Sequence, residues 1–354
     1  MSVVARFEIH HSQFLDPHGK PVQPLPEFAR DAKALVELYR WMTLMRAYDA
    51  KAIALQRTGQ LGTFASLLGH EAINAAIGSA MRPDDVFLMT YRENGAQLMR
   101  GVRLEELFLY WGGDERGCDT TGARRDFPIC VTIAAHTTHA VGVAYAMKLR
   151  KEQRAAVCTL GDGATSKGDF YEGLNAASAW KLPLVFIITN NQWAISVPRK
   201  AQTAAQTLAQ KAIAAGVEGL QVDGNDVIAV KHALDQALAK ARSGGGTTVI
   251  EAVTYRLSDH TTADDASRYR SPDELAEAWK AEPILRLRGY LMASGTWDKA
   301  REDALLKECN EKVQAAAQAY LDTPPPTREQ MFDHLYAKLP AALEKQRAAA
   351  LGDN

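Results

Sequence analysis

Cysteine is scarce in this sequence of 354 residues, and its four cysteines include no C-x-x-C pair of the kind found in zinc and redox sites. The four are Cys118, Cys130, Cys158 and Cys309. Because they form no such pattern, we expect reduced thiols, as in cytoplasmic proteins. A run of about 20 apolar residues, the length that spans a membrane, is missing, and no apolar core of a signal peptide follows Met1. We therefore expect a cytoplasmic protein with no membrane partner.

An excess of positive or negative charge is absent as well. Lysine and arginine together number 41, aspartate and glutamate number 42, and the formal net charge is -1. Because the basic residues are scattered, the sequence lacks the electrostatic footprint of a nucleic-acid-binding protein. Two phosphate-binding motifs are also missing, the G-x-G-x-x-G of dinucleotide folds and the Walker lysine motif. These absences argue against nucleic acid as a partner and against NAD or ATP as a ligand.

The chain divides by composition into an arm, one large domain and a C-terminal extension. Residues 1–30 are rich in proline, histidine and glutamine and form the expected N-terminal arm. Asp31 is the expected cap of a long helix with apolar residues at spacings of three, four and seven, and Gly59 is expected to end it. We expect a single α/β domain over residues 31–322. A proline-rich linker opens residues 323–354, where we expect a final amphipathic helix.

A strand, a helix and a second strand are predicted in succession near the middle of the chain. Residues 155–160 form a short apolar run between a charged segment and a glycine, which is typical of a buried parallel strand. Asp169 is predicted to cap a helix that extends to Trp180, since Glu172 follows it by three residues. The β-branched run 184–188 is the second strand. In such a βαβ unit the two strands run parallel and end at the same edge of the sheet.

The residues that follow these two strands predict a site for a magnesium diphosphate. Asp162 follows the first strand and Asn191 the second, so both face the crevice where ligands of open α/β sheets bind. Gly161 and Gly163 let the backbone approach a bulky anion closely. Magnesium accepts a carboxylate, an amide oxygen and a backbone carbonyl beside phosphate oxygens and water, and the Trp193 carbonyl is placed to be the third ligand. A lone Gly-Asp-Gly indicates only a tight turn, and its link to Asn191 through a βαβ unit strengthens the prediction.

Two motifs of the chain resemble those of a known family. The segment from 161 to 196 resembles the thiamine diphosphate signature of the E1 α subunits of 2-oxo acid dehydrogenase complexes, and a later segment resembles the active-site loop of the same family. The matching residues are Gly161-Asp162-Gly163-Ala164-Thr165-Ser166, Gly168-Asp169-Phe170-Tyr171-Glu172-Gly173-Leu174-Asn175, Leu182-Pro183, Asn190-Asn191 and Ala194-Ile195-Ser196, then Tyr255-Arg256, His260-Thr261-Thr262, Asp264-Asp265 and Tyr269-Arg270. The similarity covers about residues 35–345. It implies a thiamine diphosphate-binding fold with a mostly parallel central sheet flanked by helices, in which residues 31–322 are the diphosphate-binding α/β domain.

The resemblance also implies roles for individual residues. The implied Mg2+ ligands are Asp162, Asn191 and the Trp193 carbonyl. Tyr91 and Arg92 match the pair that contacts the diphosphate, and a planar guanidinium suits bidentate binding of phosphate oxygens. Ile133 matches a bulky aliphatic position that helps to hold the cofactor bent, and packing in the core is an equally good interpretation. The full implied cofactor-binding set is Tyr91, Arg92, Ile133, Gly161, Asp162, Gly163, Ala164, Asn191 and His260.

His260 is the implied catalytic residue. It lies in a polar loop after an expected strand at 248–253, and the family places a histidine near the reactive thiazolium carbon. The resemblance implies that His260 orients the 2-oxo acid or the incoming lipoyl group, and an imidazole with a pKa near about 6.5 suits proton handling there. Five residues that follow are expected to order the loop by ion pairs and hydrogen bonds. They are Asp264, Asp265, Arg268, Tyr269 and Arg270.

Three residues depart from the family pattern. Relatives mostly carry glutamine where this chain has His136 and His139. Two histidines three apart at a helix start could bind a transition metal, but no Cys, Asp or Glu ligand lies beside them in the sequence. We favour hydrogen bonding at the subunit or cofactor boundary, and the departure argues against a potassium site that some relatives build near here. Thr261 stands where animal relatives have a phosphorylated serine, which argues against phosphorylation.

The resemblance implies an enzyme that is active only with a partner chain. In the family a glutamate of a separate β subunit engages the aminopyrimidine ring of the cofactor, and this chain has room only for the diphosphate-binding domain. We therefore expect an α2β2 assembly with an E1 β subunit and a lipoyl-bearing E2 acyltransferase as the acceptor. The implied reaction is oxidative decarboxylation of a 2-oxo acid with thiamine diphosphate and Mg2+, followed by reductive acylation of the lipoyl group.

The sequence leaves several substrates open. Residues 168–173 and 209–212 resemble bacterial pyruvate dehydrogenases and favour pyruvate, whereas residues 261–265 resemble the branched-chain enzymes that act on 3-methyl-2-oxobutanoate. Acetoin dehydrogenase is a third member of the family to consider. An alternative of another class is a nucleotide-binding α/β protein without enzymatic activity, because glycine-rich turns after strands bind many phosphates. The missing nucleotide motifs argue against that alternative.

Overall fold

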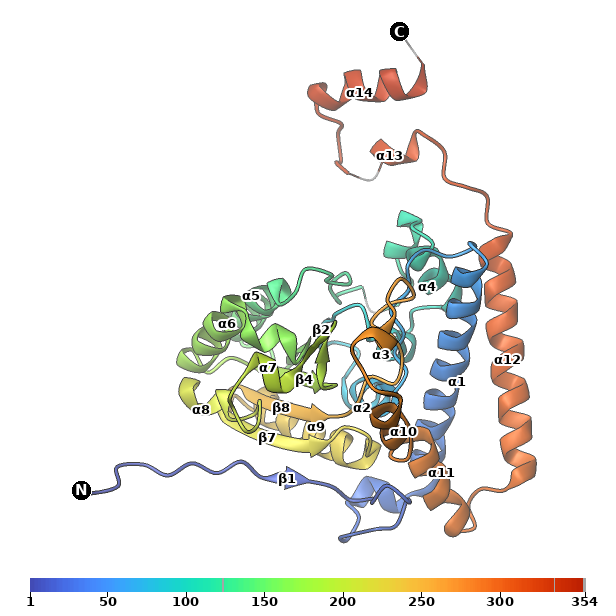
Figure 1. Cartoon of the computed structure of the whole chain (residues 1–354). Helices are drawn as coiled ribbons and strands as arrows, with labels where there is room; N and C mark the ends of the chain where they lie inside the picture. Colours follow the sequence, from blue (N-terminus) through green and yellow to red (C-terminus); the bar gives the residue numbers. More distant parts are fainter. Residues whose placement is uncertain (123, 334, 353–354) are drawn as a thin grey trace.

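A parallel sheet forms the centre of the computed structural model, which describes residues 1–122, 124–333 and 335–352. Within these residues the sheet has six strands in the order β1-β7-β8-β4-β3-β2, and every neighbouring pair is parallel (Figure 1). The strands are β1 (His11–Ser12), β2 (Val86–Leu88), β3 (Ala156–Gly161), β4 (Leu184–Asn190), β7 (Glu218–Asp223) and β8 (Thr248–Val253), with a separate antiparallel hairpin of β5 (Trp193–Ala194) and β6 (Val197–Pro198). The sheet confirms the predicted α/β class and the parallel βαβ unit.

Helices cover both faces of the sheet (Figure 1). On one face lie α2 (Glu71–Ala80) and α9 (Val227–Arg242), backed by α1 (Ala32–Arg57). On the other lie α5 (Ala135–Leu149), α6 (Gly168–Ala179) and α8 (Lys211–Ala215). The remaining helices are α3 (Asn94–Met99), α4 (Leu104–Trp111), α7 (Arg199–Gln202), α10 (Pro272–Trp279), α11 (Pro283–Ala293), α12 (Lys299–Leu321), α13 (Gln330–Asp333) and α14 (Ala341–Leu351).

The central strand β4 shows why both faces need a helical cover. All of its residues are buried. Val185 and Ile187 belong to the apolar cluster of α2 and α9, whereas Leu184, Phe186 and Ile188 belong to the cluster of α5 and α6. Because successive side chains of a strand point to opposite faces, burial of both faces requires an unbroken apolar run. The run at 184–188 has this pattern.

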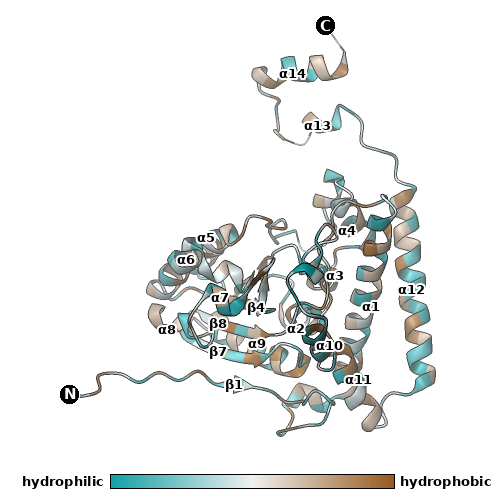
Figure 2. Ribbon diagram, viewed as in Figure 1, coloured by the Kyte–Doolittle hydropathy of each residue, from teal (hydrophilic) through white to brown (hydrophobic). Residues whose placement is uncertain are grey.

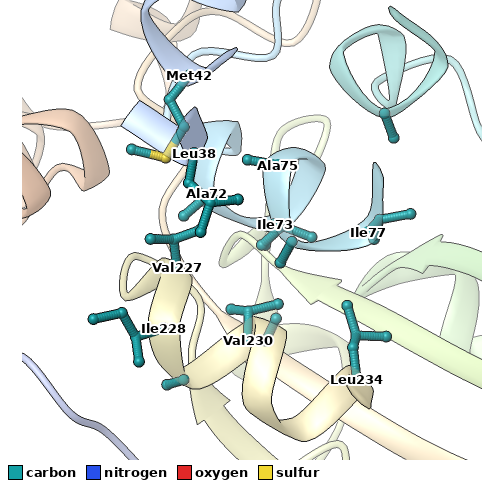
Figure 3. Packing of buried hydrophobic residues seen from close by; sticks show 14 of the residues in the cluster. Leu38, Met42, Ala72, Ile73, Ala75, Ile77, Val227, Ile228, Val230 and Leu234 are labelled. Carbon is teal, nitrogen blue, oxygen red and sulfur yellow. The ribbon is translucent and has the colours of Figure 1, made fainter. Parts of the chain in front are cut away.

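Apolar packing holds α2 between α1 and α9. Figure 3 shows Ala72 of α2 between Leu38 of α1 and the start of α9, and Ile73 of α2 above Val230 of α9. These side chains are almost completely buried, and each large one contributes about 1.5–3 kcal/mol by its removal from water. The residue before α2 is His70, which lies with the residues that follow β2, β3 and β4 at the carboxyl edge of the sheet.

The predicted ends of α1 are confirmed. The carboxylate of Asp31 accepts a hydrogen bond from the Lys33 backbone N–H at 2.9 Å. Gly59 follows the helix with a φ of +74°, a left-handed conformation that glycine adopts without strain. The long helix α12 lies beside α1 in Figure 1. It alternates between teal and brown in Figure 2 because one face, which includes Leu305 and Val313, is buried and the other meets water.

The start of α6 was predicted two residues too late, with Asp169 as the cap where the structure has Lys167. A short 3-10 turn at Gly163–Ser166 follows Asp162, so the extended residue before the helix is Lys167, and no side chain caps the helix. Asp169 lies instead in the first turn. A carboxylate at that position stabilises the helix through the positive end of its dipole rather than through a capping hydrogen bond.

The N-terminal arm is attached to the sheet from β1 onward. β1 pairs with β7, and the next residues, Phe14 and Leu15, are buried. Their backbone N–H groups donate to the Asp226 carboxylate at 2.7 and 2.8 Å. The same carboxylate caps α9 by accepting from the Ile228 backbone N–H at 3.0 Å. One buried side chain therefore holds both the arm and the helix.

Replacing Asp226 with alanine is expected to release the arm and uncap α9. The loss of the cap and of two buried hydrogen bonds should lower the free energy of unfolding by about 2–4 kcal/mol, measured by urea denaturation. Limited proteolysis should then cut within residues 1–30 sooner than in the wild type. Asp235→Ala, which removes an exposed partner of Lys231 on the same helix, is the control and should change little. An unchanged stability in Asp226→Ala would show that the carboxylate does not anchor the arm.

The C-terminal segment leaves the body of the molecule after α12. Figure 1 shows α13 and α14 away from the sheet and its covering helices, and no residue of α14 is buried. None of the helices in the described ranges has both the length and the apolar character needed to cross a membrane.

Candidate active site

A cavity of about 440 Å³ opens at the carboxyl edge of the sheet. Residues 90–93 after β2, residues 161–164 after β3, Asn191 after β4 and His260 in the loop after β8 all line it. Each site residue predicted from the sequence borders this cavity: Tyr91, Arg92, Ile133, Gly161, Asp162, Gly163, Ala164, Asn191, Trp193 and His260. The fold thus brings them together, and their individual roles stay predictions.

The expected metal ligands lie among buried polar groups. Asp162 is 3% exposed, and burial raises the pKa of its carboxyl group. Gln202 Nε2 donates to Asp162 Oδ2 at 3.0 Å. The Asn191 side-chain oxygen accepts from the Trp193 backbone N–H at 3.2 Å, and the Trp193 carbonyl accepts from Arg256 Nη1 at 3.3 Å. A buried carboxylate beside an amide oxygen and a backbone carbonyl fits a hard divalent cation, because the cation offsets the cost of burying the charge.

The two asparagines after β4 have different surroundings. Asn190 Nδ2 donates to Glu251 Oε1 at 2.7 Å. The other oxygen of Glu251 accepts from the Leu208 and Ala209 backbone N–H groups, so Asn190 belongs to a buried structural network. Asn191, in contrast, lines the cavity. Only the second asparagine is therefore available to a ligand.

Two glycines shape the floor of the cavity. A Cβ at Gly161 would have no atom within 4 Å, so open space lies above this residue. A Cβ at Gly163 would lie 2.6 Å from the Ala194 Cβ, so only glycine permits the close contact between this loop and the hairpin. The open backbone at Gly161 fits a bulky anion such as a diphosphate.

Arg92 and His260 are joined by hydrogen bonds. Arg92 Nη2 lies 2.9 Å from His260 Nδ1 and donates to the His260 carbonyl at 2.5 Å, and Nη1 donates to the Ser66 carbonyl at 2.5 Å. A guanidinium has no acceptor atom, so His260 Nδ1 accepts and the neutral ring carries its proton on Nε2. Burial, with Arg92 and Arg256 nearby, lowers the pKa of His260 to about 4. The edge of the ring also meets Tyr91, with centroids 6.1 Å apart.

Hydrogen bonds order the His260 loop. Asp264 Oδ2 accepts from the His260 backbone N–H at 2.9 Å and from the Tyr269 hydroxyl. Tyr269 in turn accepts from Arg256 Nη2 at 2.8 Å. Arg270 Nη1 donates to the Ser258 carbonyl at 3.2 Å. Hydrogen bonds of the expected kind are present, but no ion pair among the described residues involves the charged members of this loop. Arg270 donates to backbone carbonyls instead.

The two histidines at the start of α5 face different surroundings. His136 is buried, and its Nε2 lies 2.6 Å from the Thr159 carbonyl, so Nε2 carries the proton. His139 is exposed and stacks on Phe127. Within the described residues no group of three His, Cys, Asp or Glu side chains is arranged to hold a metal ion. His136 also lines the cavity, and a role in hydrogen bonding at the cofactor boundary stays a prediction.

A family model described as "Dehydrogenase E1 component" matches residues 39–329 of the chain. The chain belongs to this family. Membership confirms the resemblance to E1 α subunits of 2-oxo acid dehydrogenases and implies thiamine diphosphate as the cofactor.

Curated relatives resemble this E1 component over nearly its whole length. The pyruvate dehydrogenase E1 component subunit alpha of Mycoplasma pneumoniae is 38% identical, covering 96% of this chain and 94% of its own. The subunit of the same name from Acholeplasma laidlawii is 39% identical, covering 94% and 96%. The 3-methyl-2-oxobutanoate dehydrogenase subunit alpha of Mycobacterium tuberculosis is 38% identical, covering 95% and 92%.

Two residues that line the E1 component's cavity, Gln202 and His70, and one residue beside it, Arg256, received no role from the sequence. Gln202 contacts Asp162, Arg256 contacts the Trp193 carbonyl, and His70 lines the cavity wall. Arg256 belongs to the matched Tyr255-Arg256 motif, so its position in that motif was the available signal. Gln202 and His70 lie outside every quoted motif, and only the folded chain brings them to the site. Ile133 lines the cavity with 46% of its surface exposed, so packing in the core does not explain it.

His260 in the cofactor-free E1 component is expected to stay neutral down to about pH 4. Its folded-state pKa lies below the ordinary 6.5, so the stability contributed by the neutral ring is fully present above pH 6.5 and is lost as the pH falls toward 4. NMR of labelled histidine should detect this titration directly. Arg92→Leu should raise the pKa of His260, because one nearby positive charge is removed. A His260 that titrates near its ordinary value with Arg92 intact would contradict the described surroundings.

Proposed function

We propose that this E1 component decarboxylates pyruvate oxidatively and acetylates the lipoyl group of an E2 acyltransferase, together with an E1 β subunit. The observation that supports this most is the convergence of Asp162, Asn191 and His260 on one cavity at the carboxyl edge of the sheet. Relatives named as pyruvate dehydrogenase subunits, at 38 and 39% identity, support the choice of pyruvate. A relative with the branched-chain name, at 38% identity, makes 3-methyl-2-oxobutanoate the second candidate.

Different cavity residues would bind different parts of the cofactor. Asp162, Asn191 and the Trp193 carbonyl would hold Mg2+, and the backbone at Gly161 would lie against the diphosphate. Arg92, 5% exposed at the cavity wall, would add positive charge at the same end. Bound thiamine diphosphate supplies the electron sink that accepts the electron pair released when CO2 leaves the 2-oxo acid. The protein supplies position and electrostatic stabilisation.

His260 would act through its Nε2–H. Because Nδ1 accepts from Arg92, only Nε2 is left to meet a ligand in the cavity. A neutral ring with a proton on Nε2 can donate a hydrogen bond to the 2-oxo acid or to the lipoyl group. The hydrogen bonds to Asp264 and Arg92 hold the loop and the ring in this orientation, so the Nε2–H donor is positioned before a ligand arrives.

Exposed apolar side chains at the mouth of the cavity are evidence for a surface that a partner chain covers. Ile133, Ile195 and Val197 line the cavity and are 46, 54 and 44% exposed. Large apolar side chains gathered around a polar site are typical of a surface that another chain covers. We assign that place to the E1 β subunit in an α2β2 assembly.

A substrate panel tests the choice of acid. The chain is co-expressed with its β subunit and loaded with thiamine diphosphate and Mg2+, and reductive acylation of a lipoyl domain is followed. We expect kcat/KM for pyruvate to exceed that for 3-methyl-2-oxobutanoate by about tenfold or more, the scale on which an apolar pocket separates acids that differ by a few methylenes. A preference for the branched acid would overturn the choice of pyruvate.

A further inference from the structure

His70 is a buried histidine whose ring has no hydrogen-bond partner. It precedes α2, is 1% exposed and lines the active-site cavity. Neither Nδ1 nor Nε2 has a partner among the described residues. Leaving a buried donor or acceptor unpaired costs about 1–3 kcal/mol. A protein retains such a group where a ligand satisfies it.

The surroundings of His70 point to an anion. Burial, Arg92 and Arg256 lower the pKa of the ring, so it is neutral and has one N–H donor and one bare nitrogen. The residue before His70, Gly69, accepts a hydrogen bond from the Thr254 hydroxyl at 2.7 Å, and Arg256, two residues after Thr254, donates to the Trp193 carbonyl at 3.3 Å. His70 therefore lies beside the segment that contacts an expected metal ligand. The N-terminus of α2 adds the positive end of a helix dipole. Two guanidinium groups, a helix start and an unpaired ring N–H together suit a phosphate oxygen.

We propose that His70 binds the cofactor by donating a ring N–H to an oxygen of its diphosphate. This assignment rests on the proposed function, since it gives a further residue to the same site. Two other ligands could pair with the His70 ring, namely the carboxylate of the 2-oxo acid and a buried water. The diphosphate is favoured because His70 lies beside the segment 254–256, whose Arg256 contacts the carbonyl of the expected metal ligand Trp193, whereas the exposed apolar side chains lie at the mouth of the cavity.

Two substitutions separate a binding role from a structural one. His70→Leu removes both ring nitrogens and fills similar volume, and His70→Gln keeps a donor and an acceptor. Because the ring is unpaired in the cofactor-free chain, His70→Leu should leave its thermal stability unchanged or raise it. His232→Leu is the control, since this histidine packs edge-on against Phe14 and does not line the cavity.

The experiment is isothermal titration of the assembled αβ enzyme with thiamine diphosphate and, separately, with inorganic pyrophosphate, both in the presence of Mg2+. In His70→Leu the Kd for each should rise by about tenfold or more, the value of a hydrogen bond to a charged group. His70→Gln should stay within about threefold of the wild type, because an amide N–H replaces the ring donor. The KM for the 2-oxo acid should change little in both variants.

Three outcomes would overturn the proposal. Unchanged Kd values in His70→Leu would assign the ring to a buried water, and a raised KM with unchanged Kd would assign it to the substrate carboxylate. A His70→Leu enzyme that loses thermal stability before any ligand is added would assign the ring a structural role. If the wild-type enzyme itself does not bind thiamine diphosphate, the proposed function is wrong. That result differs from the three outcomes above, in which the wild-type enzyme binds the cofactor.

Discussion

Asp162→Asn is expected to abolish magnesium-dependent binding of thiamine diphosphate. The substitution keeps the shape of the side chain and removes the single carboxylate from the expected metal site. Removing a residue that only hydrogen-bonds to a metal ligand lowers metal affinity roughly 10–100-fold. Removing a direct ligand should therefore lower the affinity by more than about 100-fold. Isothermal titration of the assembled enzyme measures the effect. Retention of magnesium-dependent binding would remove Asp162 from the site.

The same variant should not unfold the chain. Burial raises the pKa of the Asp162 carboxyl group, which means that the ionised carboxylate destabilises the folded state of the cofactor-free protein. A neutral amide in its place should leave thermal stability unchanged or raise it. Asp169→Asn, in the first turn of α6, is the matched control and should bind the cofactor normally. This pairing distinguishes loss of a ligand from loss of fold.

His260→Ala is expected to spare the cofactor and to impair transfer to the lipoyl group. Loss of a preorganised hydrogen-bond donor costs about 100–1,000-fold in kcat, so reductive acylation of the lipoyl domain should fall on that scale. The Kd for thiamine diphosphate should stay within a few-fold of the wild type, since Arg92 keeps its hydrogen bond to the Ser66 carbonyl. Stopped-flow or steady-state assays with a lipoyl domain measure the rate.

His139→Ala is the control for removal of an imidazole near the same cavity wall. His139 is exposed and does not line the cavity, so its loss should leave kcat unchanged. Equal activity of His260→Ala and wild type would refute the catalytic assignment. A large rise in the cofactor Kd would make His260 a binding residue instead.

Sequence patterns predicted the site residues that directly follow a strand. Asp162 and Asn191 each follow a strand directly, and the right-handed βαβ crossover places both at one edge, so pattern and topology suffice. Residue spacing alone could not predict that Asp169 would miss the cap, because the 3-10 turn after Asp162 moved the helix start.

Contacts between segments that are distant in the chain could not be predicted from the sequence patterns. Arg92 was expected to present a bidentate fork to the diphosphate, but the fold directs two of its nitrogens to the carbonyls of Ser66 and His260. The low pKa of His260 has a similar origin, since it depends on burial and on Arg92 from another loop, together with Arg256 of its own loop. His70 gave no signal because its role depends on the absence of a partner, which only the packed chain reveals.

The most direct test is calorimetric titration of thiamine diphosphate into the wild-type chain co-purified with its β subunit, with and without Mg2+. We expect binding that requires Mg2+ and that disappears in Asp162→Asn. Binding of NAD or ATP in place of thiamine diphosphate, or no binding of thiamine diphosphate with Mg2+ present, would contradict a diphosphate site at Asp162 and Asn191.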